Sequence, residues 1–340
     1  MTRTMSVGRP ASRSTEVDSG LGFALAAGAV AMASAILAGW APLGCSIVAV
    51  FLFAGPHNWM EARYFLGRLP ARWGKLRPFF LVGFGGVIGL SASLAGLPVL
   101  ASRWDWGGGA WSLAAAAWNT AFVLWVAALV GMRAGQNPRR DWSAAIPLTF
   151  LALAAAWIAP PLWGLALVYL HPLMAFWIFD RELLRSRPGW RRGYHLVLAV
   201  VPAMLGLLWW HLASAPPLPG TDALTLRVVR HAGSGYLPGI SSRVLVATHV
   251  FLELLHYGVW IAAVPLVGLR AAPRQTGAIP LARRSASWRR GLNMGLIAGL
   301  GIVLVLWGGF LTDYPTTRDV YFTVATLHVL AEVPFLLRAL

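Results

Sequence analysis

The 340-residue chain is poor in cysteine and in charge. Its single cysteine, Cys45, excludes an intramolecular disulfide, a cysteine-ligated iron–sulfur cluster and the CxxCH attachment of a c-type haem. Charged residues make up 12% of the chain, against about 25% in an average soluble domain. A soluble protein could not hide the apolar surface of a chain that is 58% hydrophobic, so the composition predicts a membrane protein.

Hydrophobic runs recur from Leu21 to the C-terminus, and each can cross the roughly 30 Å hydrocarbon core of a bilayer. We expect an all-α polytopic integral membrane helix bundle with about ten transmembrane helices. A cytoplasmic tail (residues 1–20) precedes a single transmembrane domain (residues 21–340). The predicted spans are 21–40, 44–62, 79–101, 112–132, 144–160, 162–179, 195–213, 244–267, 292–311 and 319–338. The fifth and sixth share the Pro160–Pro161 break, and one hairpin is the alternative.

The net charge of +16 is distributed over short loops, which indicates membrane orientation rather than nucleic-acid binding. With the N-terminus inside, the basic residues of the outer loops are Arg103, Arg227, Arg230, Arg243 and Arg318. All other Lys and Arg fall inside, which predicts an N-in, C-in, multi-pass protein of the plasma (inner) membrane. The basic and aromatic segment Arg63–Arg77 is typical of a contact with membrane lipids.

Three acidic residues remain inside the predicted spans, and each lies four residues after a histidine. The pairs are His57–Glu61, His249–Glu253 and His328–Glu332. Four residues make about one helical turn, so the two members of each pair share a face. His256 extends the stripe of the second pair.

A carboxylate inside a membrane costs about 2.5–3.5 kcal/mol on insertion scales, which indicates a function. No Lys or Arg lies in the predicted spans, so we expect a divalent metal, which could be Fe, Mn or Zn, to neutralise the glutamates. Of these, Fe(II) with open coordination positions suits oxygen chemistry. The candidate catalytic residues are Glu61, Glu253 and Glu332. The candidate metal ligands are His57, His171, His249, His256 and His328. One or two metal ions are both compatible with this set, and the glutamates are ligands, supports of a ligating histidine, or proton sites.

Structural roles are the alternative for the same groups. His171 can equally hydrogen-bond between helices, and a buried glutamate can be neutralised by a proton. His195, His211 and His231 lie at span ends or in a loop, where we expect them to contribute to packing.

Two short motifs carry a family resemblance. The segment GPHNWME (Gly55–Glu61) and the closing segment TLHVLAE (Thr326–Glu332) resemble the histidine motifs of the Brp/Blh-type membrane β-carotene 15,15'-dioxygenases. His249 and His256 stand where that family carries a pair of histidines, although here the spacing is seven and Glu61 replaces an aspartate. The resemblance implies an iron enzyme that cleaves a carotenoid with oxygen and holds its metal through His57, His256 and His328.

The sequence therefore favours a membrane-embedded, metal-dependent oxygenase or related redox enzyme that acts on a lipid-soluble substrate, such as a carotenoid or other isoprenoid. A proton-coupled transporter, with the glutamates as proton sites, is the first alternative. A haem-b electron carrier, with two histidines on facing helices, is the second.

Overall fold

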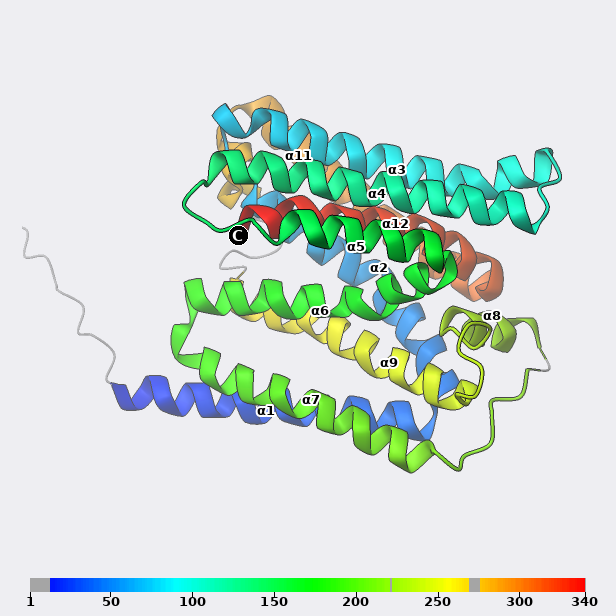
Figure 1. Ribbon diagram of the computed structural model, residues 1–340. Helices are drawn as coiled ribbons and strands as arrows, with labels where there is room; N and C mark the ends of the chain where they lie inside the picture. Colours follow the sequence, from blue (N-terminus) through cyan, green and yellow to red (C-terminus); the bar gives the residue numbers. More distant parts are fainter. Residues whose placement is uncertain (1–12, 221, 269–275, 340) are drawn as a thin grey trace, which may run out of the picture.

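A computed structural model describes residues 13–220, 222–268 and 276–339 of the chain. These residues form a bundle of helices that run roughly parallel or antiparallel to one another (Figure 1). The long helices are α1 (Arg13–Trp40), α2 (Pro42–Arg68), α3 (Arg77–Arg103), α4 (Gly108–Gln136), α6 (Pro160–Ser186), α7 (Arg191–Leu212), α9 (Ser242–Gly258), α11 (Ala286–Thr312) and α12 (Tyr314–Ala339). The shorter ones are α5 (Ala145–Ile158), α8 (Ala223–His231) and α10 (Val264–Gly268).

Nine helical segments in the described part of the chain are long and apolar enough to cross a membrane. The prediction of an all-α polytopic membrane bundle is thereby confirmed. The start of α1 and the end of α12 lie at the same end of the bundle (Figure 1), as the predicted N-in, C-in arrangement requires. Residues 1–12 of the predicted tail, and Arg270 and Arg274 of the last inner loop, lie outside the described residues.

The fifth predicted span differs from the prediction. Helix α5 has 14 residues, and at about 1.5 Å per residue it is shorter than a core of roughly 30 Å, although it runs back along α4 toward the start of α6 (Figure 1). It ends at Ile158, because Pro160 and Pro161 cannot continue the helix and instead begin α6. Helix α8 is a further element that was not predicted. Its N-terminus is capped by the side chain of Asp222, which accepts a hydrogen bond from the backbone N–H of Thr225.

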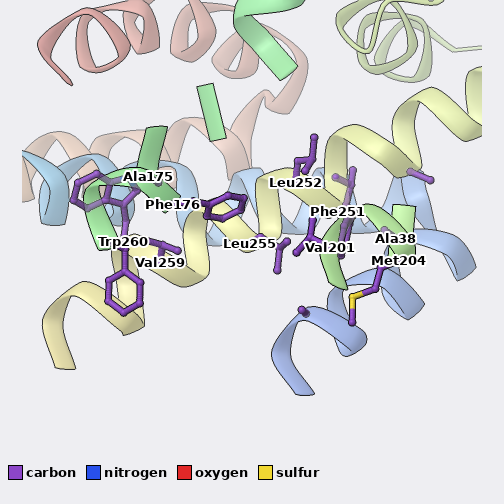
Figure 2. Packing of buried hydrophobic residues seen from close by; sticks show 14 of the residues in the cluster. Ala38, Ala175, Phe176, Val201, Met204, Phe251, Leu252, Leu255, Val259 and Trp260 are labelled. Carbon is purple, nitrogen blue, oxygen red and sulfur yellow. The ribbon is translucent and has the colours of Figure 1, made fainter. Parts of the chain in front are cut away.

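Helix α9 is the centre of the bundle. Together with a π-helical turn (Val259–Ala263) and α10 it forms one segment, of which 61% is buried, compared with 17–33% for the other spans. It contacts α1, α2, α6, α7 and α8. Figure 2 shows part of the apolar cluster around it, in which Phe251 and Leu255 of α9 lie near Ala38 of α1 and Met204 of α7. The side chains that α9 presents are therefore shielded from lipid.

A second apolar cluster joins α3, α4, α11 and α12 on the other side of the bundle. Leu330 and Val333 of α12 belong to it, whereas Leu255 and Val259 beside His256 belong to the first. The polar groups of α9 and α12 thus lie between two apolar layers, where unpaired polar atoms are costly.

Candidate metal centre

Three helices bring four predicted site residues to one point. His57 and Glu61 of α2, His256 of α9 and His328 of α12 each offer a nitrogen or oxygen atom within 4.8 Å of the others. The side chains of His57, Glu61 and His256 are buried. This group, which we call the histidine centre, could hold a metal ion.

Local sequence sets the orientation of His57. Pro56 interrupts the hydrogen bonding of α2 immediately before it, since proline has no N–H. The Nδ1 atom of His57 lies 2.9 Å from the carbonyl oxygen of Phe53. A carbonyl only accepts, so Nδ1 carries the proton in this hydrogen bond and Nε2 keeps its lone pair. The ring is held in the tautomer that can bind a metal through Nε2.

His256 lies just before the irregular part of its segment. The π-helical turn Val259–Ala263 follows it within one helical turn, and Pro265 follows that turn. The missing N–H of Pro265 removes a hydrogen bond of the regular α-helix, which gives a physical cause for the wider turn. Both ring nitrogens of His256 are buried and have no hydrogen-bond partner among the described residues.

His171 of α6 joins the centre from a fourth helix. Its ring centroid lies 4.5 Å from that of His256 and 5.0 Å from that of His328. The Nε2 atoms of His171 and His328 are 3.2 Å apart. The structure thus brings His171 beside the four residues of the histidine centre.

Glu332 lies beside a histidine of another helix. Its Oε2 atom is 3.2 Å from Nδ1 of His171, although the angle is not that of a hydrogen bond. Glu332 is fully buried. The sequence had paired it with His328 through their four-residue spacing. The structure places its carboxylate where it can orient the His171 ring.

The remaining predicted pair forms a separate polar group on α9. Nδ1 of His249 lies 3.7 Å from Oε2 of Glu253, and the hydroxyl of Tyr257 donates a 2.6 Å hydrogen bond to Oε1. The ring of His231 from α8 lies 5.0 Å from that of His249. His249 and Glu253 are thus not among the residues of the histidine centre.

Two further residues, Arg318 and His231, lie beside this pair. Arg318 was expected in an outer loop, but it lies in the first turns of α12 with 3% exposure, its guanidinium 4.5 Å from the Phe322 ring centre. His231 was expected to have a packing role. Burial, with His249 and Arg318 nearby, lowers the pKa of His231, so its ring is neutral at neutral pH. The amphipathic pattern of residues 223–231 is the signal that could have revealed α8.

An apolar cavity of about 510 Å³ connects the two polar groups. His57, His171, His256 and His328 line one part of it, and His231, His249 and Glu253 line another. The rest of the wall is mainly apolar and includes Leu94, Leu97, Trp111, Trp118 and Leu167. The centre therefore faces a space that suits a hydrophobic molecule.

The unpaired atoms of the centre fit a metal ion. Both oxygens of Glu61, both nitrogens of His256 and Nδ1 of His328 are buried without a hydrogen-bond partner among the described residues. Imidazole nitrogen and carboxylate oxygen are ligands of Fe, Mn and Zn. A cation would satisfy atoms that are otherwise costly to bury.

The two motifs that resemble the Brp/Blh-type dioxygenases supply most of this site. GPHNWME contributes His57 and Glu61, and TLHVLAE contributes His328 and Glu332. Between them, His256 lies in the centre and His249 pairs with Glu253. Comparisons with protein-family models, curated proteins and solved structures found no match to the chain, so the relationship to that family stays a prediction.

Proposed function

We propose that the protein is a membrane-embedded, non-haem iron oxygenase or related redox enzyme that acts on a lipid-soluble substrate. The observation that carries the proposal is the opening of the buried histidine centre onto the apolar cavity. A membrane enzyme of a hydrophobic substrate needs this combination, because the reactive group must meet the substrate away from water.

The ligand set supports iron. His57, His256 and His328 supply nitrogen, with Glu61 as an oxygen donor and His171 within reach. Bound iron would supply open coordination positions and redox capacity for oxygen chemistry. The carbonyl of Phe53 holds His57 in a ligating tautomer, and Glu332 lies where it can orient His171. Glu61 and Glu332, with the four histidines around them, are enough for one or for two ions.

The cavity favours an isoprenoid, such as a carotenoid. Its walls are aliphatic and indole side chains, with polar groups confined to two places. Oxidative cleavage of a carbon–carbon double bond needs no external reductant, since both atoms of dioxygen end as the carbonyl oxygens of two products. An apolar substrate dissolved in the plasma membrane would lie at the depth of the centre.

Two observations weigh against the alternatives. Four imidazole rings crowd around one point with centroids 4.5–5.3 Å apart, which leaves little room for a haem between two of them. A proton-coupled carrier would use the glutamates as proton sites, but it would not require so many histidines to converge on Glu61.

Metal analysis tests the proposal. We expect the purified protein to retain about one or two iron ions per chain and to lose most of them in His256→Ala. His211→Ala is the matched control, because His211 is exposed on α7 and is not one of the residues of the histidine centre. Equal iron content in the two variants would contradict the proposal. A Soret band would favour the haem carrier, and a wild-type protein that stays metal-free after incubation with Fe(II) would favour the transporter.

A further inference from the structure

A second cavity lies at the end of the bundle where α2, α6 and α12 terminate, beyond the histidine centre along these helices. Its volume is about 390 Å³, and four arginines line it: Arg68, Arg181, Arg185 and Arg338. Tyr64 and Trp177 contribute aromatic walls. By the predicted orientation this is the cytoplasmic end.

The charge of this cavity is mostly uncompensated. Its neighbouring acid, Glu182, is buried and engaged: Arg68 contacts its Oε2 atom, Tyr64 donates a 2.9 Å hydrogen bond to the same oxygen, and Ser186 donates one of 2.8 Å to Oε1. No carboxylate of the described residues lies within ion-pair distance of the other three cavity arginines. The cavity therefore carries an excess of positive charge.

Arg181 is held in place while its buried Nε donor stays unsatisfied. Its guanidinium carbon lies 5.1 Å from the centre of the Trp177 ring, an arrangement that fixes the side chain by a cation–π contact. The Nε atom is buried and has no hydrogen-bond partner among the described residues. A buried donor without an acceptor is costly, and an anion in the cavity would remove that cost.

The surface next to the cavity is apolar. On α6, Leu170, Leu173 and Trp177 precede Arg181 at spacings of three and four residues, so they form one stripe that leads from the membrane interior to the arginines. Leu170 and Leu173 are 55% and 45% exposed. An acyl chain could lie along this stripe while its phosphate reaches the cavity.

We propose that this cavity binds the phosphate group of an anionic phospholipid. Basic cavities between transmembrane helices at the cytoplasmic side are suited to such headgroups. Arginine is favoured for phosphate because its planar group donates two hydrogen bonds at once. The site is separate from the histidine centre, so this proposal does not depend on the proposed iron site.

Lipid binding by the detergent-purified full chain tests this site. Native mass spectrometry would compare phosphatidylglycerol with phosphatidylcholine of the same acyl chains. We expect retention of phosphatidylglycerol to fall about tenfold or more in Arg181→Gln/Arg185→Gln, with phosphatidylcholine unaffected. Arg289→Gln/Arg290→Gln removes the same charge from exposed positions of α11 and should retain wild-type binding. Equal losses in the two variants, or no preference for phosphatidylglycerol, would overturn the proposal.

A second arm separates the lipid from a free anion. Millimolar inorganic phosphate should leave bound phosphatidylglycerol in place, because it lacks the acyl chains that contact α6. Displacement by phosphate would show a site for a free anion and would overturn the lipid assignment. If the double variant does not fold, Arg185→Gln alone is to be compared with Arg290→Gln, with the same outcomes expected at smaller amplitude.

Discussion

The Nε2 atoms of His171 and His328 lie 3.2 Å apart, although 157 positions separate the two residues in the chain. Two ligand atoms on neighbouring positions of a six-coordinate metal, with bonds of about 2.1 Å, are about 3 Å apart. The observed separation therefore suits two nitrogens that face one ion, as well as a hydrogen bond between one protonated and one free nitrogen.

Glu332 and Glu253 should differ in their effect on metal binding. In Glu332→Gln the charge beside Nδ1 of His171 is lost, and we expect metal affinity to fall about 10–100-fold, as for other carboxylates that orient a ligating histidine. Glu253→Gln changes a carboxylate that contacts His249 and Tyr257 instead, so affinity should stay close to wild type. Competition with a chelator measures both. Similar affinities for the two variants would show that Glu332 does not support the centre.

Filling the large cavity should reduce turnover without removing metal. Ala115 of α4 lines the cavity, so Ala115→Trp would occupy space that the substrate needs. Ala117, two residues further along, is exposed on the outside of the bundle, and Ala117→Trp is the matched control. Chromatography would measure how fast a carotenoid or other isoprenoid is consumed. We expect this rate to fall at least about tenfold in Ala115→Trp only, because the substrate is misplaced. Full turnover by Ala115→Trp would place the substrate elsewhere.

Neighbouring glycines of α3 should respond differently to the same substitution. A Cβ atom at Gly86 would lie 1.9 Å from the indole nitrogen of Trp125, which donates a hydrogen bond to the carbonyl of Val82. Gly86→Ala must displace that ring, and we expect a loss of about 1–3 kcal/mol of stability. At Gly85 nothing lies within 4 Å of the added atom, so Gly85→Ala should be neutral or stabilising. Thermal unfolding in detergent compares the two, and equal melting temperatures would refute the close contact.

The N-terminus of α8 should become less stable in acid. Asp222 accepts hydrogen bonds from the backbone N–H and the hydroxyl of Thr225, and these hold the pKa of Asp222 below its ordinary value of 3.8. A lowered pKa in the folded state means that the stabilisation is present above 3.8 and disappears as the pH falls through the folded value. The protection of residues 223–231 against hydrogen exchange, taken at each pH relative to an unstructured peptide of the same sequence, should therefore fall at low pH. Asp222→Asn should weaken that pH dependence, whereas Asp313→Asn, at the start of α12, should leave it unchanged.

The sequence was informative about which residues stay in the membrane, because burial of Glu61, Glu253 and Glu332 is costly and their spacing from histidines is regular. It was less informative about which helices meet. A four-residue spacing places Glu332 and His328 on one face, but the carboxylate lies beside His171, and only the arrangement of α6 against α12 decides this. Similarly, Arg318 reads as a loop residue until α12 and its contact with Phe322 are known.

Helix α11 supplies no residue to the histidine centre, but it determines where His57 lies. Val303 fills the space beside Gly55, with a side-chain carbon 3.0 Å from where a Cβ would be. On either side of that contact the two helices exchange indole hydrogen bonds, from Trp59 to the Leu296 carbonyl and from Trp307 to the Phe51 carbonyl. The turn that carries His57 is thus held against α11 by contacts at three positions along the two helices. A larger side chain at position 303 would move His57 away from its partners, and metal affinity would change through a residue that never touches the metal.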